Sequence, residues 1–269
     1  MPPAGSAGTS KLAGVELTLP EPFYPRGEHV AIELPGGHAL FTTRRGGFSE
    51  GPYASLNLGR LTADRPEAVQ RNRAKLHDEV GRPPVYIRQV HGTSVRTITK
   101  RSVPGVAPLP DEGVELPEVD GQATALPDLA PMVMTADCLP VALVGRGAVA
   151  MLHAGWRGLA AGIVAAGVGA MRDLGIDGAI EAAIGPGAGG CCYEVGDEVR
   201  ETFADYGEHV RRGRNLDLKA IARDQLLAAG MAAVHDVGLC TICSDPSLFF
   251  SHRRDRGITG RQAGLAWLS

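Results

Sequence analysis

The hydrophobic positions are densest in the middle of the chain, where three short apolar runs follow one another. These runs are 132–134, 141–144 and 148–152, and polar residues or glycines separate them. Uninterrupted apolar runs of this length are typical of strands that are buried on both faces. The pattern therefore predicts a buried sheet at the centre of the molecule.

Turn residues and further apolar runs predict more strands around this centre. Residues 31–34 and 39–43 flank Pro35-Gly36-Gly37, which indicates two strands joined by a tight turn, and 44–47 then forms a loop. Residues 85–89 are predicted to form a short strand that ends near His91. Residues 179–184 are predicted to form another, which ends in the glycine-rich loop 185–190.

Helical spacing is clearest over residues 64–80, where Val69, Leu76 and Val80 fall on one face. Asp64 is the expected N-cap, because it precedes Arg65-Pro66 and proline is favoured at the first helical position. The segment 103–118 contains four prolines and several acidic residues and is predicted to be an exposed loop. Three more helices are predicted, at 156–174, 196–206 and 218–229.

The length of 269 residues and the hydrophobic content of 44% allow a substantial core in one large or two small domains. Residues 1–14 are rich in Pro, Gly, Ala and Ser and lack the basic and apolar regions of a signal peptide. We therefore expect a disordered tail over 1–14 and a folded domain over 15–269. The longest apolar candidate, 158–171, is shorter than the roughly 20 residues that a membrane span needs.

The charge and the cysteines limit the classes of partner and compartment. A formal net charge of −3 provides no basic footprint, which argues against a nucleic-acid partner. Five cysteines in a chain with a large core are typical of a protein in a reducing compartment rather than of a disulfide scaffold, so we expect a cytoplasmic protein.

Three residues offer donors that zinc prefers: His91, Cys138 and His153. Three protein ligands would leave a fourth position open for water or substrate. Their spacing does not match a zinc finger, so a metal site requires that they converge in space. Two alternatives remain. Cys138 could be a small buried apolar residue beside histidines whose hydrogen bonds are made within the protein. Its thiolate could instead be a nucleophile activated by an imidazole.

Two other segments carry weaker signals. Arg157 follows His153 at the predicted start of a helix, where an anion such as phosphate can bind, although an ordinary turn with Arg157 paired to a surface acid explains it as well. Cys240 and Cys243 have the spacing of half a zinc ribbon or of a redox pair, but no second pair follows them. Because Cys191 and Cys192 lie far upstream, we interpret these four cysteines as structural thiols.

Taken in order, the motifs resemble the bacterial YfiH-like family, once labelled multicopper polyphenol oxidase or laccase-domain proteins. The resemblance extends from about Ala39 to Arg261. It rests mainly on five segments: Arg88 to Gly92, Thr135 to Pro140, His153 to Gly158, Cys191 to Gly196, and Phe249 to Gly260.

The resemblance implies a single-domain α+β fold with mixed sheets flanked by helices. It also implies that His91, Cys138 and His153 bind zinc, with copper as an alternative. The implied activity is phosphorolysis of adenosine, inosine, guanosine or methylthioadenosine, together with adenosine deamination, so the partners would be a nucleoside and phosphate. Multicopper oxidation of phenols would need more histidines than this site provides.

These implications give a working hypothesis for the site. Phosphate would bind near Arg157 and Arg44, with Asn57 as a further substrate-binding residue. Cys138, Asp137 and His91 would be catalytic, with Asp137 either a proton shuttle or a structural carboxylate. Two other functions remain open: an amidase that edits cell-wall precursors at the same site, and a binding protein in which zinc only stabilises the core.

Overall fold

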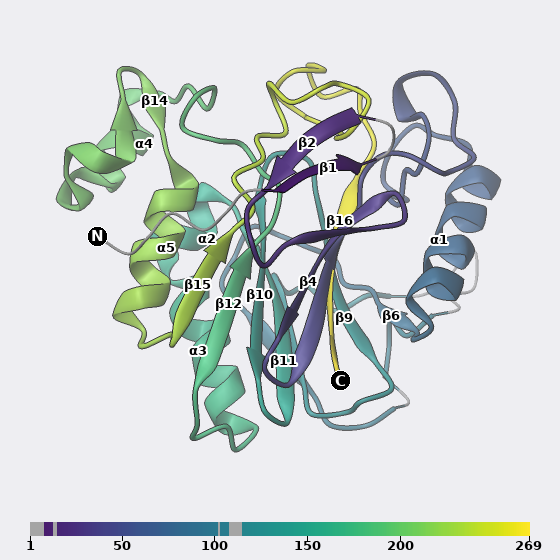
Figure 1. The fold of residues 1–269 in the computed structure, drawn as a ribbon, viewed down its shortest axis with the longest axis horizontal. Coiled ribbons are helices and arrows are strands. Elements are labelled where there is room, and N and C mark those ends of the chain that lie inside the picture. The colour runs from purple at the N-terminus through teal and green to yellow at the C-terminus, as the bar shows by residue number, and fades with distance from the viewer. Residues whose placement is uncertain (1–7, 13–14, 102, 108–114) are drawn as a thin grey trace.

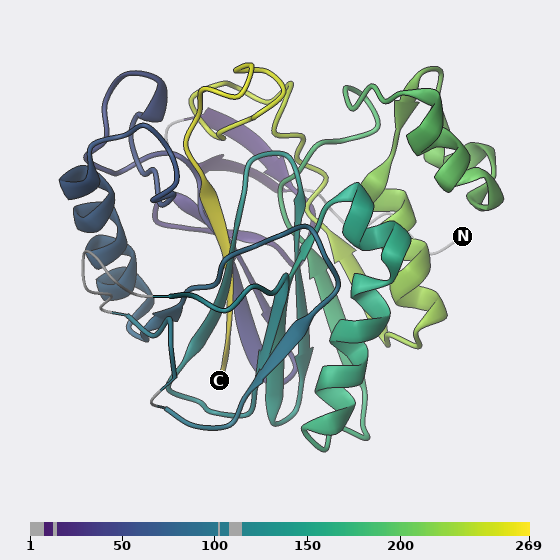
Figure 2. The same cartoon turned by 180° about the vertical axis from the view of Figure 1, so that it is seen from behind.

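The computed structural model describes the whole chain except residues 1–7, 13–14, 102 and 108–114. Two six-stranded sheets pack face to face, and helices cover the outer faces (Figures 1 and 2). This arrangement confirms the α+β fold class and the mixed sheets flanked by helices.

The first sheet contains the strand that follows Cys138 and the strand that carries His153. Its strand order is β15-β12-β10-β11-β8-β7, with antiparallel pairing at the centre and parallel pairing at both edges. The strands are β7 (Val95–Ile98), β8 (Gly121–Thr124), β10 (Leu139–Gly145), β11 (Ala148–Ala154), β12 (Ile180–Ile184) and β15 (Ala233–Asp236).

The second sheet has the order β3-β4-β5-β16-β9-β6 and is antiparallel except for the β6–β9 pair. Its inner face packs on the first sheet: Phe41 and Val133 of this sheet and Met151 of the first belong to one buried cluster. The strands are β3 (Tyr24–Arg26), β4 (His29–Leu34), β5 (Gly37–Phe41), β6 (Pro84–Val85), β9 (Ala130–Thr135) and β16 (Gln262–Leu268).

Helices on opposite sides of the molecule complete the four layers (Figure 1). The outer face of the first sheet packs against α2 (Trp156–Ala161), α3 (Ile163–Asp173) and α5 (Leu218–Ala228). The outer face of the second sheet packs against α1 (Pro66–Val80), which contributes Leu76 and Val80 to that core. The smaller elements are β1 (Gly8–Leu12), β2 (Val15–Leu19), α4 (Asp197–Thr202), β13 (Arg211–Arg212), β14 (Asn215–Leu216) and 3-10 turns at Gly51–Tyr53, Ala204–Tyr206 and Glu208–Val210.

The central apolar runs form β9, β10 and β11, whose residues are almost all buried, as their composition predicts. The helix predicted over 156–174 is instead two helices, because Gly162 adopts a φ of 97° that ends α2. The N-cap of α1 is Arg65 and not Asp64, whose Oδ2 accepts a hydrogen bond from Asn57 Nδ2 at 2.9 Å. The helix predicted over 196–206 is shorter, since α4 ends at Thr202.

Two further segments differ from the predictions made from the sequence. Strand β1, Gly8–Leu12, lies inside the segment expected to be a disordered tail and pairs with β2. The rest of 1–14 lies outside the described residues. In the predicted loop 103–118, Val106 forms a bridge with Val85 and Gly105 is buried, so its described part packs against the second sheet.

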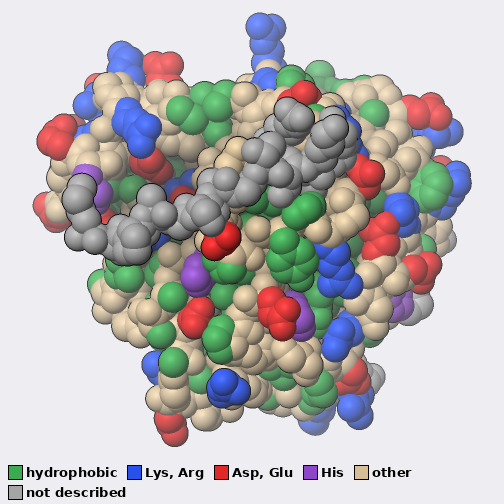
Figure 3. All heavy atoms as spheres, in the orientation of Figure 1, with side chains coloured by type: hydrophobic (Ala, Val, Ile, Leu, Met, Phe, Trp, Pro, Cys, Tyr) green, Lys and Arg blue, Asp and Glu red, His purple; other side chains and the backbone are tan. Residues whose placement is uncertain are grey.

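Two surface properties bear on partners. Among the described residues, no helix has both the length and the apolar character that crossing a membrane requires. On the face drawn in Figure 3, acidic and basic side chains are interspersed rather than gathered by sign. That face therefore offers no continuous basic patch for a polyanion.

Candidate metal centre

The structure brings His91, Cys138 and His153 together. One donor atom from each, two imidazole nitrogens and a sulfur, lies within 4.8 Å of the other two. The two imidazole rings meet edge to face, with their centroids 4.8 Å apart. His153 is buried, Cys138 is partly buried and His91 is exposed, so the group opens to solvent on one side. The convergence that the sequence could not show is therefore present.

Strand pairing explains why Cys138 and His153 are neighbours. Pro140 in β10 pairs with His153 in β11, and Leu139 pairs with Ala154. Cys138 immediately precedes β10, which places its thiol at the same end of the two strands as the His153 imidazole. His91 arrives on the connection between β6 and β7.

A buried carboxylate that the sequence analysis did not assign orients this group. Asp120 is fully buried, and its Oδ1 lies 2.8 Å from His153 Nδ1. The backbone N–H groups of Val90, His91 and Gly92 donate to the same carboxylate, at 3.2, 2.9 and 2.6 Å. Burial raises the pKa of Asp120, but these hydrogen bonds outweigh it and lower the pKa overall. When His153 Nδ1 donates to Asp120, its Nε2 is left to bind a metal.

Two residues of the site have an unusual backbone conformation. His91 has a φ of 61° and Asp137 a φ of 94°, whereas Arg256 is the one other non-glycine residue with positive φ in the described part of the chain. Such conformations are costly for residues with a Cβ and persist where the surroundings enforce them. At His91 the enforcing contact is the bond from its backbone N–H to Asp120.

Gly155 provides the space in which the thiol and the imidazoles meet. A Cβ at this position would lie 2.9 Å from Cys138 Sγ and 3.3 Å from His91 Cδ2. The donor types, their spacing, the Asp120 hydrogen bond and this space together fit a divalent metal ion with N, S and N ligands.

We expect Gly155→Ala to weaken metal binding by about ten- to a hundredfold, because the added methyl group displaces the thiol or the imidazole from the ligand positions. A competition titration with a chromogenic chelator would measure this change. The matched control is Gly169→Ala in α3, where an added Cβ meets nothing within 4 Å. That control is expected to stabilise the helix by about 0.5–1 kcal/mol and leave metal affinity unchanged. Equal affinities of the two variants would contradict the steric role of Gly155.

The thiol and the buried imidazole influence each other's protonation. Burial raises the pKa of the Cys138 thiol, but His153 and His91 outweigh this and lower the pKa to about 6. Burial lowers the pKa of His153, but the Cys138 thiolate and Asp120 raise it to about 9. The thiolate and the imidazolium therefore stabilise each other's charged form.

Metal affinity is expected to rise with pH between about 6 and 9. In this range the metal must displace the proton of His153, whose pKa is raised to about 9. Below pH 6 the Cys138 thiol is protonated as well, so the loss of affinity on acidification becomes steeper there. Chelator competition at a series of pH values would measure the slope. A pH-independent affinity from pH 6 to 9 would show that the metal displaces no proton from His153 in this range and would contradict the raised pKa of His153.

The three donors lie on the wall of a large cavity of about 1490 Å³. Ligand sites usually measure about 300–1,000 Å³, so this one has room for a nucleoside and an anion side by side. The cavity wall carries positive charge and aromatic surface. The arginines are Arg60, Arg73, Arg88, Arg157, Arg253 and Arg261, and the aromatic residues are Trp156 and Tyr193. Three acidic residues, Glu115, Glu118 and Asp137, lie on the same wall.

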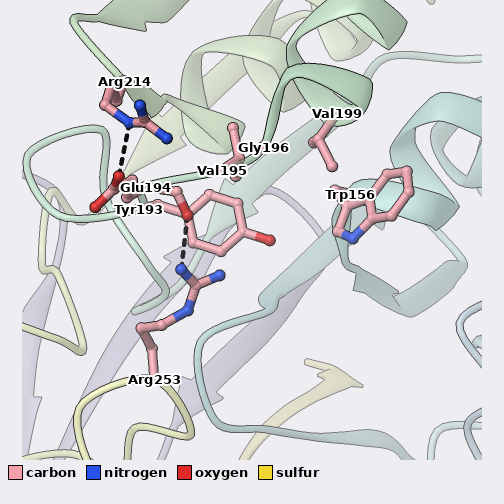
Figure 4. A pocket seen from close by; sticks show the side chains of 8 residues that line it. All are labelled: Trp156, Tyr193, Glu194, Val195, Gly196, Val199, Arg214 and Arg253. Carbon is pink, nitrogen blue, oxygen red and sulfur yellow. Dashed lines mark hydrogen bonds and ion pairs between the residues drawn. The ribbon is translucent and has the colours of Figure 1, made fainter.

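A smaller pocket of about 280 Å³ adjoins this cavity and shares Trp156, Tyr193 and Arg253 with it (Figure 4). The Tyr193 ring lies between Trp156 and Arg253 in this view. Arg253 Nη1 donates to the Glu194 carbonyl at 2.6 Å, and its guanidinium lies 5.1 Å from the Tyr193 ring centroid. These contacts hold a cation and an aromatic ring at the edge of the cavity.

Asp137 also lines the cavity, but both of its carboxylate oxygens accept hydrogen bonds from the protein. Oδ1 accepts from the Thr241 hydroxyl and Oδ2 from the backbone N–H of Arg253, both at 2.7 Å. These bonds tie the turn that carries Cys138 to two distant loops. They favour the structural carboxylate over the proton shuttle, the two roles that the sequence left open.

Arg44 and Asn57 do not lie with the other predicted site residues. Arg44 donates to the carbonyls of Pro52, Ala54 and Pro246 and is not part of the cavity wall. Asn57 is buried, and its Oδ1 accepts from the backbone N–H groups of Gly59 and Arg261. Asn57 therefore supports two residues of the wall without facing the cavity, whereas Arg157 does line it.

The chain belongs to the multi-copper polyphenol oxidoreductase laccase family, whose model matches residues 38–269. This confirms the resemblance inferred from the motifs. Within the described residues, the groups that could hold a metal ion are the His91, Cys138 and His153 group and one cluster of four cysteines.

The chain is also similar to named relatives and to a solved structure. The chain is 42% identical to a purine nucleoside phosphorylase of Streptomyces coelicolor, over 87% of this chain and 96% of that protein. It is 40% identical to a purine nucleoside phosphorylase of Xylella fastidiosa, over 87% of this chain and 93% of that protein. The crystal structure of the hypothetical protein YfiH from Bacillus licheniformis superposes with a TM-score of 0.79 at 33% identity, covering 93% of this chain and all of that one.

Proposed function

We propose that this protein is a zinc-dependent purine nucleoside phosphorylase that acts on adenosine, inosine, guanosine and methylthioadenosine and also deaminates adenosine. The observation that carries the proposal is the open His91, Cys138 and His153 group on the wall of a cavity rich in arginine and aromatic side chains. The names of relatives that are 40% and 42% identical to the chain support the phosphorylase part of the proposal.

The cavity wall divides by chemistry into two kinds of surface. Arg157 and Arg261 offer guanidinium groups to phosphate, an anion whose geometry allows paired hydrogen bonds with arginine. Trp156 and Tyr193 offer flat apolar surface against which a purine ring can stack. The substrates would thus be a purine nucleoside and inorganic phosphate, held side by side.

In phosphorolysis a phosphate oxygen forms a bond to C1′ of the ribose while the bond from C1′ to the purine breaks. The electron pair of that bond leaves with the purine, and positive charge develops on the sugar. The arginines would fix the attacking anion in line, so that positioning provides much of the rate enhancement. When bound by His91, Cys138 and His153, zinc would supply a Lewis acid at this wall.

Deamination of adenosine would use the same cavity without phosphate, with water replacing the amino group of the purine ring. Asp137 is not assigned as the proton carrier, because its oxygens accept bonds from Thr241 and Arg253. Its proposed role is to hold Cys138 and the Arg253 loop in place.

The test is to incubate the zinc-loaded protein with inosine and phosphate, and separately with adenosine alone. The proposal expects ribose 1-phosphate and hypoxanthine from the first mixture and inosine from the second. Omitting phosphate should abolish the first reaction and leave the second. If neither product forms with protein that contains stoichiometric zinc, the proposal is wrong.

The other functions considered from the sequence have less support. The relatives described above carry phosphorylase names and not amidase names, so the cell-wall amidase is not favoured. Oxidation of phenols by several copper ions needs several histidine-rich sites, whereas the described residues place just two histidines at the centre.

A further inference from the structure

Four cysteines from two distant segments form a second cluster. The sulfur atoms of Cys191, Cys192, Cys240 and Cys243 all lie within 4.8 Å of one another. From the sequence alone they are expected to be structural thiols, because the first pair lies far upstream of the second. The structure instead brings the two pairs together, and none of the four belongs to the His91, Cys138 and His153 group.

The spacing of the sulfurs matches a tetrahedral shell. Zinc–thiolate bonds of about 2.3 Å place the four sulfurs of a tetrahedral site about 3.8 Å apart. The Sγ atoms of Cys191 and Cys243 are 3.6 Å apart, and no pair in the cluster exceeds 4.8 Å. All four cysteines are free thiols, so none is used in a disulfide.

Backbone pairing holds the two segments against each other. Gly187 and Cys240 form a parallel bridge, and the Thr241 N–H donates to the Gly187 carbonyl at 3.1 Å. Gly189 allows the close approach, because a Cβ there would lie 3.2 Å from Cys191 Sγ and 3.3 Å from Cys240 Cβ. The cluster is thus built by the fold and is not an accident of side-chain rotamers.

The sulfur of Cys240 is surrounded by hydrogen-bond donors of the backbone. The N–H of Gly189 lies 3.3 Å from this sulfur, and the N–H groups of Ile242 and Cys243 also donate to it. A turn in which backbone N–H groups converge on a cysteine sulfur suits a metal-bound thiolate, since such donors stabilise its negative charge.

We propose that Cys191, Cys192, Cys240 and Cys243 bind a second zinc ion in a closed, four-sulfur, structural site. Four thiolates fill the tetrahedral shell, so no coordination position remains for substrate. Cys191 and Cys243 are exposed, which gives the ion a path from solvent. The proposal is independent of the activity proposed above.

This second site would hold two segments that build the wall of the cavity. Thr241 lies between Cys240 and Cys243, and its hydroxyl donates to Asp137 beside Cys138. Tyr193 follows Cys192 and lines the cavity. Loss of the second ion is therefore expected to lower thermal stability and raise KM, and to leave the metal at the first centre.

The test begins with metal analysis of protein purified under reducing conditions and loaded with zinc, followed by removal of excess ion. Wild type is expected to hold about two zinc ions per chain and Cys138→Ala about one. In Cys138→Ala, zinc-edge X-ray absorption should show a shell of sulfur alone, and cobalt loading should give the intense thiolate charge-transfer band of a tetrahedral four-sulfur site.

Cys243→Ser in the wild-type background is expected to lower the content to about one zinc ion per chain, whereas Ser244→Ala, at the neighbouring position, keeps about two. The proposal is overturned if wild type holds no more than one zinc ion while all four thiols react with an alkylating reagent. It is equally overturned if the cysteines prove to be joined as disulfides in metal-free protein. Because wild type and Cys138→Ala decide the question, the test stands even if Cys243→Ser does not fold.

Discussion

Replacing Cys138 with alanine is expected to empty the metal centre and to lower kcat/KM for inosine phosphorolysis by at least about a thousandfold. A metal ion acting as a Lewis acid contributes several kcal/mol to transition-state stabilisation, and each 1.36 kcal/mol is about a tenfold change in rate. The two histidines that remain cannot hold the ion at the same affinity. Steady-state kinetics and metal analysis of the same preparation would measure both effects.

Whether Cys138→Ala stays folded distinguishes a catalytic metal from one that only stabilises the core. If the centre is catalytic, the variant keeps its circular dichroism spectrum and unfolds cooperatively, while its activity is lost. If zinc only stabilised the core of a binding protein, the variant would be unfolded at ambient temperature. A folded variant that has lost the metal at this centre and keeps full activity would contradict the role of the centre altogether.

Asp120→Asn is expected to weaken metal binding by about ten- to a hundredfold, because carboxylates that orient metal-bound histidines usually contribute this much. The substitution removes the negative charge that accepts from His153 Nδ1 and from three backbone N–H groups. Activity at low zinc should fall accordingly, and added zinc should restore part of it. Chelator competition and zinc-dependent activity would provide the measurements.

The matched control for this substitution is Glu181→Gln. Glu181 Oε2 lies 3.1 Å from His235 Nε2, so this is another carboxylate–histidine pair, on β12 and β15 and outside the metal centre. Its loss should leave metal affinity unchanged. If both variants bind zinc as tightly as wild type, Asp120 has no part in orienting the ligand.

The centre of the fold and the three residues of the candidate metal centre could be singled out from the sequence. The strands β9, β10 and β11 were predictable because they are buried on both faces and therefore apolar throughout. The three residues could be singled out because histidine and cysteine in distinctive short motifs limit the chemistry. Strand β16 was missed, although all its residues are buried, because Gln262 and Gly264 interrupt its apolar pattern.

The sequence failed where a role depends on partners far away in the chain. Arg44 has the charge of a phosphate ligand, but one of the carbonyls that it bonds belongs to Pro246. Asp120 is distinguished by its burial and by the four N–H donors around it, and neither is visible in its neighbours along the chain. The four-cysteine cluster likewise requires the bridge between Gly187 and Cys240.

Two of the three residues of the candidate metal centre lie where the chain passes from one sheet to the other. Cys138 lies between β9 of the second sheet and β10 of the first, and His91 lies between β6 and β7, which are divided in the same way. The donor set is therefore complete only when the two sheets are packed together, which depends on contacts distant in sequence. Uptake of the ion would thus mark the end of folding, and a mutation deep between the sheets could impair catalysis without touching the cavity.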